Sequence, residues 1–457
     1  MPTLLVKNIS HLFTMQRDAI KGEESEFELQ DAALFCRDGI IEQVGKTSDL
    51  PNQADEILDL SGHVVIPGLI NTHHHLYQNL TRVVPGAQDA PLFGWLQTLY
   101  PIWGKLGSDH IFSSARVGLA ELALSGCTTS SDHLYLFPND ARLDDEIRAA
   151  QDIGLRFHAT RGSMSIGESS GGLPPDDLVE DEESILEDCV RVVEAHHDPT
   201  PFAMTRIALA PCSPFSVSQK LMLDSAEMAR KFGVGLHTHL AENVEDINYS
   251  QEKFGMRPGE YIQSLGWTGS DVWHAHCVQL DAPEIELFAA TKTGVAHCPC
   301  SNMRLASGIA PVREMIDAGV RVGLGVDGSA SNDSAHLLSE ARQALLLQRV
   351  LKGAAALTAR EALRLATIGG ADVLNRDDIG SLQVGKAADF AAFRTDQLNM
   401  AGCDWDPVSA LIFCGPFNSA YTVVQGKQVV AEGQLVYQDL SELLDYHRQL
   451  TIDLIDS

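Results

Sequence analysis

Apolar and polar residues alternate along the middle of the chain in a way that is typical of repeated strand–helix units. Between about residues 64 and 380, short apolar runs are separated by stretches of helical apolar spacing, such as Ile111–Leu124, Leu221–Phe232, Glu284–Thr291 and Val312–Ala318. Eight of these runs end in a polar or metal-binding residue: Val64–His75, Cys127–His133, Leu155–Arg161, Arg206–Ser213, Val234–His239, Asp271–His276, Gly294–His297 and Arg321–Asp327. Eight such units predict an α/β fold, a (β/α)₈ TIM barrel.

A doubly wound open sheet is the competing topology. That fold carries a Gly-rich phosphate-binding loop after its first strand, whereas the first run here leads into His73-His74-His75. We therefore favour the barrel, in which functional side chains collect at the carboxyl ends of the strands.

Both ends of the chain are predicted to form β structure, because short apolar runs are separated there by turn residues such as Asp38-Gly39. We expect the two ends to pair in one small β-sandwich domain made of residues 1–66 and 381–457, beside a metal-dependent barrel of residues 67–380. The runs are Leu4–Ile9, Ala32–Cys36, Ile40–Val44, Asp389–Phe393, Ala420–Val424 and Val429–Ala431.

Composition narrows the class of protein. The 457 residues are 44% hydrophobic and 21% charged, which is ordinary for a globular protein, and the net charge of −29 disfavours nucleic acid and anionic membranes as partners. Nine scattered cysteines suit reduced thiols. The start lacks a secretory pattern, and no apolar run is long enough to cross a bilayer. We expect a cytoplasmic protein.

Four candidate metal ligands follow three of the predicted strands. His73 and His75 stand at i and i+2, so they share a face of an extended chain. A lone strand histidine is more often a core residue, but His239 closes the fifth run and Asp327 the eighth. Imidazole and carboxylate groups gathered from these strand ends suit a borderline cation such as Zn²⁺, and Fe²⁺ or Mn²⁺ also fit such a set.

The order of the motifs resembles the amidohydrolase superfamily, in its mononuclear deaminase branch. The resemblance is carried by PGLINTHHH, HTHLAE, HAHCV, HCPCSNMRLASG, GVDGSASND and IGSLQVGKAADF. Within this branch, HHHLYQNLTR, SDHLYLFP, RGSMSIGESSGGLPPD and APCSPFSVS are most similar to bacterial 8-oxoguanine deaminases, which are often labelled hydroxydechloroatrazine ethylaminohydrolases. The resemblance implies zinc-dependent deamination of 8-oxoguanine to urate and ammonia. Guanine, a pterin or a hydroxylated s-triazine is the alternative substrate of the same mechanism.

The resemblance also implies roles for individual residues. His73, His75, His239 and Asp327 would hold one Zn²⁺ per chain, and Glu242, His276 and Asp327 would be catalytic. In such a site an acid at Glu242 can protonate the ring nitrogen beside the attacked carbon, Asp327 can carry the proton of the attacking water to the amine, and His276 can orient that water. The alternative for Glu242 is an exposed acid at a helix start.

The number of metal ions depends on the fourth strand. Binuclear members of the superfamily bridge two ions with a Lys or Glu from that strand, which here ends Ala210-Pro211-Cys212-Ser213-Pro214. We therefore expect one ion, and a binuclear hydrolase of esters or cyclic amides is a further alternative. Cys212 is interpreted as a neutral residue that faces the substrate, although a thiolate could also bind zinc. A non-catalytic scaffold is disfavoured because every ligand position is filled.

Five residues are assigned to the substrate side of the site: Gln78, Arg161, Cys212, Ser213 and His237. Gln78 could instead lie on a surface helix, and Arg161 could instead form a structural salt bridge. His237 shares a strand face with His239 and is interpreted as its support. The long segment 162–181 has the length of a lid, and we assign it no role. We expect a small heterocyclic substrate and a homodimer or higher homo-oligomer.

Overall fold

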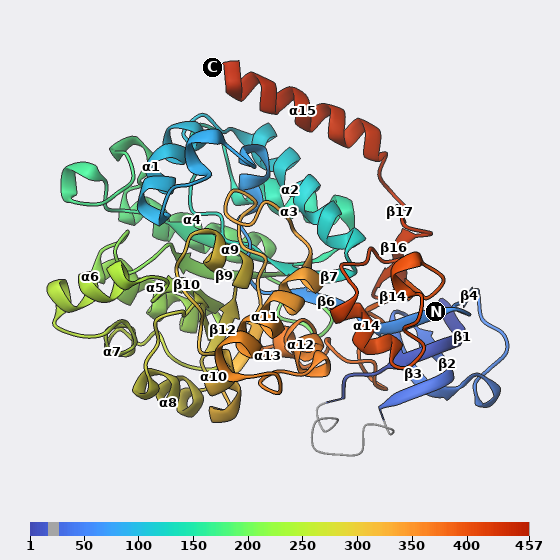
Figure 1. The fold of residues 1–457 in the computed structure, drawn as a ribbon. Helices are drawn as coiled ribbons and strands as arrows, with labels where there is room; N and C mark the ends of the chain where they lie inside the picture. Colours follow the sequence, from blue (N-terminus) through green and yellow to red (C-terminus); the bar gives the residue numbers. More distant parts are fainter. Residues whose placement is uncertain (17–26, 457) are drawn as a thin grey trace.

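The computed structural model describes residues 1–16 and 27–456, and its centre is a closed parallel barrel (Figure 1). The strands pair in the order in which they occur in the chain, and Leu324 of the last strand pairs with Asn71 of the first, which closes the barrel. The predicted TIM barrel is confirmed. Its strands are β6 (Leu69–Asn71), β7 (Cys127–Ser131), β8 (Arg156–Ser163), β9 (Thr205–Pro211), β10 (Gly235–Leu240), β11 (Val272–His276), β12 (Gly294–His297) and β13 (Arg321–Leu324).

Helices surround the barrel, and local signals set their ends. In α5 the Ser218 hydroxyl caps the backbone N–H of Leu221, and Gly233 ends the helix in the left-handed region with φ of 69°. The four helices predicted from apolar spacing are all present. The helices of the barrel are α1 (Leu92–Trp103), α2 (Ser108–Leu124), α3 (Leu143–Ile153), α4 (Glu182–His196), α5 (Gln219–Phe232), α6 (Val244–Phe254), α7 (Pro258–Ser264), α8 (Ala282–Thr291), α9 (Pro299–Arg304), α10 (Val312–Ala318), α11 (Leu337–Lys352), α12 (Ala359–Leu365) and α13 (Ile368–Val373).

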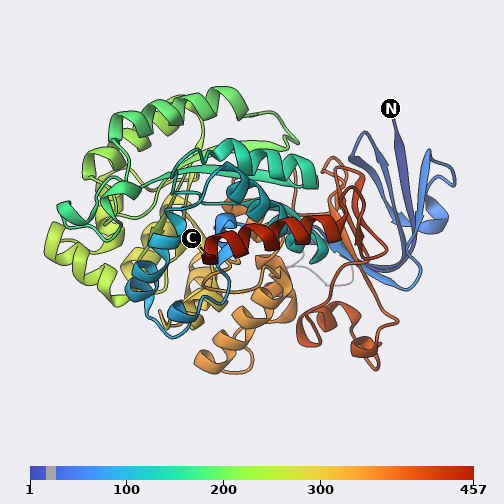
Figure 2. The ribbon, with the colours of Figure 1, turned by 90° about the horizontal axis from the view of Figure 1, so that it is seen from above.

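The two chain ends form one nine-stranded sheet beside the barrel, as Figure 2 shows. The N-terminal and C-terminal halves meet where Ile66 pairs with Ala391, and the two-residue turn Asp38-Gly39 has positive φ at both positions, as a tight hairpin requires. The expected pairing of the two chain ends in one small β domain is confirmed, and its strands form a single sheet rather than two packed sheets. Its strands are β1 (Thr3–Phe13), β2 (Glu28–Arg37), β3 (Ile40–Lys46), β4 (Glu56–Asp59), β5 (His63–Pro67), β14 (Phe390–Arg394), β15 (Tyr421–Val424), β16 (Lys427–Ala431) and β17 (Gln434–Leu435).

The apolar run Val64–His75 contains two strands that belong to different sheets. Strand β5 belongs to the terminal sheet, and β6 belongs to the barrel. The chain changes partners at Gly68, whose N–H donates to Asp389 O, while the next N–H donates to Gly126 O. A Cβ at Gly68 would lie 2.1 Å from the Thr128 hydroxyl, so the crossing needs glycine. We keep the domain limits 1–66, 67–380 and 381–457 as a proposal.

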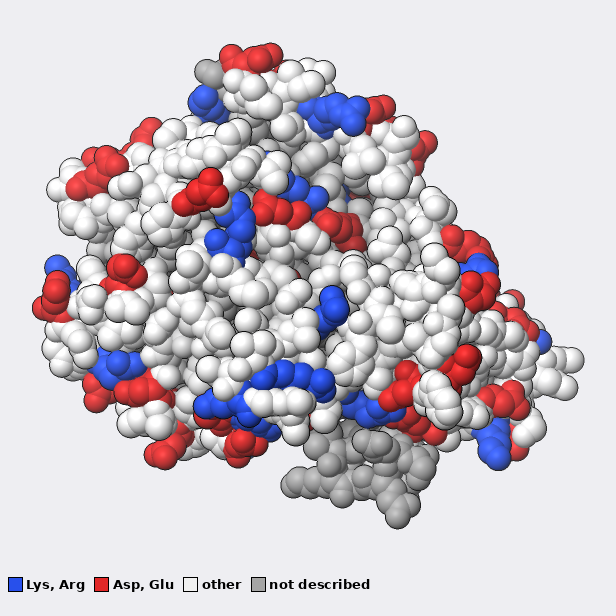
Figure 3. Space-filling view, viewed as in Figure 1, with Lys and Arg blue, Asp and Glu red and all other residues white. Residues whose placement is uncertain are grey.

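The surface carries the charge that the sequence indicates. Figure 3 shows scattered groups of Asp and Glu side chains, several of them beside Lys or Arg, on the face that it presents. None of the described helices has the length and apolar composition that a bilayer crossing requires. Outside the barrel and the sheet, α14 (Pro407–Phe413) packs against α12, and α15 (Leu440–Asp456) lies along α2.

A buried ion pair joins the barrel to the terminal sheet. Arg156 is the first residue of β8, and its Nε donates to Asp389 Oδ2 over 2.7 Å, with both side chains at most 2% exposed. Asp389 Oδ1 also accepts the backbone N–H of Gln425 over 2.6 Å. Asp389 therefore pairs with the charge of Arg156 and with the backbone N–H of Gln425, so three segments of the chain meet at this residue.

We predict that Asp389→Ala lowers the free energy of unfolding by about 3–5 kcal/mol, because it leaves the Arg156 guanidinium buried without its counter-charge. Urea denaturation followed by circular dichroism measures the change. Asp396→Ala is the matched control, since Asp396 pairs with Arg394 on the exposed end of β14, and we expect it to change stability little. Equal effects of the two substitutions would contradict the prediction.

Candidate metal centre

The first barrel strand leads into two of the predicted ligands. Strand β6 ends at Asn71, and the chain runs without regular structure to His75, where the short helix η4 (Leu76–Thr81) follows. The His73 and His75 rings lie 4.7 Å apart between centroids, while His74 Nδ1 accepts the backbone N–H of His75. The i, i+2 spacing thus brings His73 and His75 together beyond the end of the strand.

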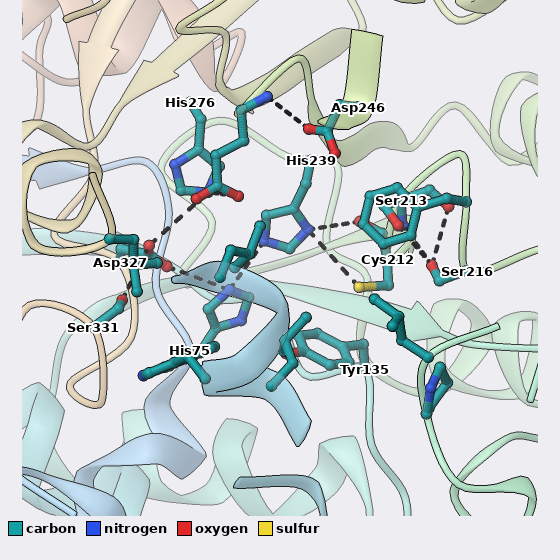
Figure 4. A pocket seen from close by; sticks show the side chains of 18 of the residues that line it. His75, Tyr135, Cys212, Ser213, Ser216, His239, Asp246, His276, Asp327 and Ser331 are labelled. Atoms are coloured by element: carbon teal, nitrogen blue, oxygen red, sulfur yellow. Dashed lines mark hydrogen bonds and ion pairs between the residues drawn. The ribbon is translucent and has the colours of Figure 1, made fainter. Parts of the chain in front are cut away.

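Four side-chain donor atoms converge at the carboxyl end of the barrel. His75 Nε2 lies 3.1 Å from His239 Nε2, and Asp327 Oδ1 lies 3.3 Å from His73 Nε2 and 3.4 Å from His75 Nε2. Figure 4 shows His75, His239 and Asp327 directed toward one another from different elements. The structure therefore gathers all four residues that the motif order assigns to the metal.

The separation of His75 from His239 and those of Asp327 from His73 and His75 match the ligand separations around a tetrahedral ion. Zinc–nitrogen bonds of about 2.0–2.1 Å place neighbouring ligand atoms of a tetrahedron about 3.3 Å apart, close to the 3.1–3.4 Å observed. His73 Nε2 is buried and has no hydrogen-bond partner among the described residues. A donor set of this kind suits a divalent cation of borderline softness.

Backbone carbonyls fix the orientation of two ligand rings. His75 Nδ1 donates to His133 O over 2.7 Å, and His239 Nδ1 donates to Cys212 O over 2.6 Å. With the ring protons on Nδ1, the Nε2 lone pairs point into the site. Burial lowers the pKa of His239 to about 3 and also lowers that of His75, so both rings are neutral, as metal ligands must be.

The third ligand ring is fixed through a second histidine. His237 Nδ1 donates to Trp273 O over 2.9 Å, so its Nε2 is an acceptor. That Nε2 lies 2.8 Å from His73 Nδ1, which must carry the proton between them. His73 Nε2 is therefore left as the free lone pair. His237 acts on the metal site through His73 and does not line the cavity beside it.

Glu242 and Asp327 line the same cavity. Glu242 follows β10, its Oε1 accepts the Ser307 hydroxyl over 3.2 Å, and its backbone N–H donates to Asp246 Oδ2 over 2.8 Å. Burial raises the pKa of Glu242. Burial alone would also raise the pKa of Asp327, but the close contact with His73 and the nearby His276 and His75 rings hold that pKa well below its usual value. The site thus contains one carboxyl group with a raised pKa, Glu242, which favours the protonated form, and one with a lowered pKa, Asp327, which favours the ionised form.

His276 lies between these two carboxyl groups. Its Nε2 is 3.6 Å from Glu242 Oε2 and 3.9 Å from Asp327 Oδ2, and its Nδ1 donates to Asn302 Oδ1 over 2.9 Å. Burial opposes a charge on the ring, but the two carboxylates outweigh it and raise the pKa of His276. The ring can therefore donate hydrogen bonds toward the cavity.

Three of the five predicted substrate residues line the cavity beside the candidate metal ligands: Gln78, Cys212 and Ser213. Gln78 is fully buried, and its Oε1 accepts the backbone N–H of Ala330 over 3.3 Å. Burial raises the pKa of Cys212 to about 12, so its thiol is neutral. Cys212 is not in the groups of described side chains that could hold an ion.

Arg161 does not line the cavity, and the structure places it in the salt bridge that was its alternative role. It pairs with Glu180 over 2.8 Å and with Asp188 over 2.6 Å, and it stacks on the Phe137 ring. Since Glu180 belongs to the segment 162–181 and Asp188 to α4, Arg161 anchors that segment to the barrel. Leu173, in the same segment, lines the cavity.

Sequence reasoning did not single out several side chains that hold the site. Asn302 and Ser307 lie within the HCPCSNMRLASG motif, and Ser331 donates to Asp327 Oδ2 over 3.3 Å from the GVDGSASND motif. Asp246, four residues after Glu242, lines the cavity as well. His133 differs from these residues, because it closes the predicted run Cys127–His133; it lies in one group with His73, His75 and His239, and its Nε2 faces Ala210 O at 2.8 Å. The motifs contained these residues, but no spacing rule identified their partners.

Comparison with known proteins shows the family of this chain. The amidohydrolase family model matches residues 64–429, which is most of the chain. The chain belongs to the amidohydrolase family. An 8-oxoguanine deaminase of Pseudomonas aeruginosa is 46% identical over 430 residues, or 93% of this chain and 96% of the relative. A hydroxydechloroatrazine ethylaminohydrolase of Pseudomonas sp. (strain ADP) is 38% identical over 454 residues, or 94% and 93%.

A solved structure that contains zinc is similar to this chain over almost its whole length. The crystal structure of an atrazine chlorohydrolase from Arthrobacter aurescens TC1, complexed with zinc, has a TM-score of 0.92 and 36% identity, and the match covers 98% of this chain and 100% of that one. The expected resemblance to the deaminase branch is confirmed by these matches. This amidohydrolase is an enzyme, and its His and Asp donor group together with the zinc-bound relative supports a divalent metal ion.

We predict one divalent ion per chain in the purified protein, measured by inductively coupled plasma mass spectrometry. His239→Ala and Asp327→Ala each remove one donor and should lower metal affinity by about tenfold or more. His197→Gln is the control, because His197 lies at the amino end of the barrel, where it accepts the backbone N–H of Ile207. Two ions per chain would contradict the single-metal assignment.

Proposed function

We propose that this amidohydrolase is a zinc-dependent hydrolytic deaminase that converts 8-oxoguanine to urate and ammonia. The coarser activity, deamination of a heterocyclic substrate, agrees with the named activities of its relatives. The observation that carries the proposal is the grouping of Glu242, His276 and Asp327 around one end of a four-donor metal centre.

The cavity can take a flat heterocycle beside these groups. Polar side chains gather at the inner end with the candidate ligands, and the outer wall is apolar: Leu92, Trp95, Leu96, Leu173, Pro174 and Phe215. A ring can therefore place its reacting edge on the polar end and its faces against apolar groups.

Glu242 and Asp327 carry out different proton transfers in the proposed reaction. A divalent ion held by His73, His75, His239 and Asp327 would supply a Lewis acid that lowers the pKa of water toward about 7. Glu242 protonates the ring nitrogen next to the carbon that bears the amino group, so attack does not build charge there. Asp327 accepts the proton of the attacking water and passes it to the departing amine.

His276 and its neighbours hold this arrangement in place. His276 donates toward the attacking water, and the Asn302 amide keeps the ring from rotating. The Ser331 hydroxyl fixes Asp327 Oδ2, so the carboxylate keeps one oxygen for the metal and one for the proton. Water adds across the C–N unit and ammonia leaves, which balances the hydrolysis. One turnover therefore consumes one water and exchanges an amino group for an oxygen.

The choice of 8-oxoguanine draws support from the 46% identical relative of that name. An oxopurine presents donors and acceptors on several edges, and a buried polar edge left unpaired costs about 1–3 kcal/mol. Gln78, Ser213 and the neutral thiol of Cys212 are the lining groups that would pair with those edges.

A hydroxylated s-triazine that loses an alkylamine is the second candidate. The apolar outer wall, which includes Leu92, Trp95 and Phe215, would accommodate an alkyl substituent, and the 38% identical relative is named for such a reaction. Guanine and a pterin are further rings of the same class.

We also propose a cytoplasmic location and a homodimer or higher homo-oligomer, without nucleic acid or membrane as partners. All nine cysteines are free thiols, which supports a reducing compartment. Helix α15 exposes Leu444, Ile452 and Ile455, which an assembly could cover. Light scattering after size exclusion measures the assembly.

We predict that Glu242→Gln lowers kcat/KM by about 10²–10⁴-fold while the metal content stays at the wild-type level, because the amide cannot supply a proton. Urate absorbance and ammonia release from 8-oxoguanine measure the rate. Glu252→Gln, an exposed carboxylate on α6, is the matched control and should retain full activity. A fully active Glu242→Gln enzyme would remove Glu242 from the mechanism.

We predict that zinc-loaded protein prefers 8-oxoguanine over guanine, a pterin and an ethylamino hydroxy-s-triazine by at least about tenfold in kcat/KM. Ammonia or ethylamine release from the four rings, compared side by side, gives the ranking. A triazine at the top would select the second candidate, and no release from any ring would overturn the proposed deamination.

A further inference from the structure

We infer that Cys403 and Cys414 are a modification site, a dithiol that small organic disulfides convert reversibly to an intramolecular disulfide. Their Sγ atoms lie 3.5 Å apart. Cys414 is exposed, and Cys403 is half-buried. The inference does not rest on the proposed function, because neither residue lines the cavity beside the metal centre.

The other cysteines are poorly placed for this reaction. Burial raises the pKa of Cys36, Cys127, Cys189 and Cys212 to about 12, so these thiols form little thiolate and are closed to reagents. Cys277 and Cys298 are buried too, and burial also raises the pKa of half-buried Cys300. Within the described part of the chain, Cys403 and Cys414 are thus the accessible pair.

Backbone hydrogen bonds hold the segments on either side of α14 that carry the two thiols. They flank α14, with the N–H of Cys403 donating to Met400 O over 3.0 Å and the N–H of Cys414 donating to Ala410 O over 2.8 Å. A disulfide bond is about 2.05 Å long, so the sulphur atoms need to approach by only about 1.5 Å. Side-chain rotation supplies a movement of that size without unfolding α14.

The order of the two steps follows from exposure and hydrogen bonding. The hydrogen bond with Cys414 raises the pKa of Cys403, so the exposed Cys414 is the first nucleophile. Its thiolate attacks one sulphur of the small disulfide, a mixed disulfide forms, and one small thiolate leaves. The Cys403 thiolate then attacks Cys414 Sγ and expels the second small thiolate. The protein loses two hydrogens, and the reagent is reduced to two thiols.

The cross-link would enclose α14 at a junction of the fold. Asp406, at the start of α14, accepts from Arg360 of α12 over 2.8 Å, and Arg360 also pairs with Glu28 of the terminal sheet. Val408, Leu411 and Ile412 of the helix are buried. Fixing both ends of α14 therefore stabilises a contact between barrel helices and the terminal sheet.

The test treats the whole metal-loaded protein with oxidised glutathione and counts free thiols after denaturation. We expect the count to fall by two from nine, with a mass loss of two hydrogens and one cross-linked peptide pair that contains Cys403 and Cys414. Dithiothreitol should restore nine thiols. We also expect the oxidised protein to have a higher Tm and an unchanged metal content.

Two variants separate this site from general thiol reactivity. Cys403→Ser should stop at one glutathione adduct on Cys414, because the second nucleophile is gone, and Cys300→Ser should still lose two thiols. A stable adduct on the wild-type protein, a disulfide between two chains through Cys414, or loss of two thiols in Cys403→Ser would each overturn the inference. Failure of the deaminase assay would leave these outcomes unchanged.

Discussion

The rest of the structure depends on the repulsion between two buried histidine nitrogen atoms, which a bound cation removes. The Nε2 atoms of His75 and His239 lie 3.1 Å apart, and backbone carbonyls hold the proton of each ring on Nδ1. Neither Nε2 can then donate to the other, so two lone pairs face each other in a buried site with the Asp327 carboxylate beside them. Burying such groups without a partner is costly, and an ion between them turns the repulsion into coordination. Metal binding and the order of the strand ends are therefore linked.

The backbone at the strand ends delivers the remaining groups by adopting an uncommon conformation. Ala241, His276 and Asp327 have φ of 49°, 69° and 62°, in the left-handed region that non-glycine residues seldom occupy. Each such residue costs about 1–3 kcal/mol unless its surroundings impose it. Hydrogen bonds between neighbouring strand ends, such as Asp327 N–H to His73 O over 3.1 Å, supply that constraint. The closed barrel thereby turns Glu242 and His276 toward the carboxylate.

Sequence patterns predicted what depends on local periodicity and missed what depends on distant partners. The eight strands and the convergence of His73 with His75 follow from spacing within short segments. The division of Val64–His75 into two strands was hidden, because both halves are apolar and only their partners differ. Gln78 and Arg161 gave the same signal, a polar residue near a strand end. Their different positions arise from Glu180 and Asp188, whose pairing with Arg161 no strand pattern reveals.

The two kinds of cavity wall differ in how strongly they can select a ring. An apolar wall distinguishes ligands by about 1–3 kcal/mol per methylene, whereas a site that pairs polar groups rejects a ring lacking them far more strongly. Gln78 is the most constrained of these groups, because its Oε1 is held by the Ala330 N–H and packs where a Cβ on Gly328 would lie 1.8 Å away. The Gln78 Nε2 donates to the Tyr77 hydroxyl over 3.4 Å, so protein groups orient both ends of the amide. If the proposed function holds, selectivity among oxopurine, pterin and triazine would rest on the polar groups of the cavity, and the apolar wall would set how large a substituent on the ring can be.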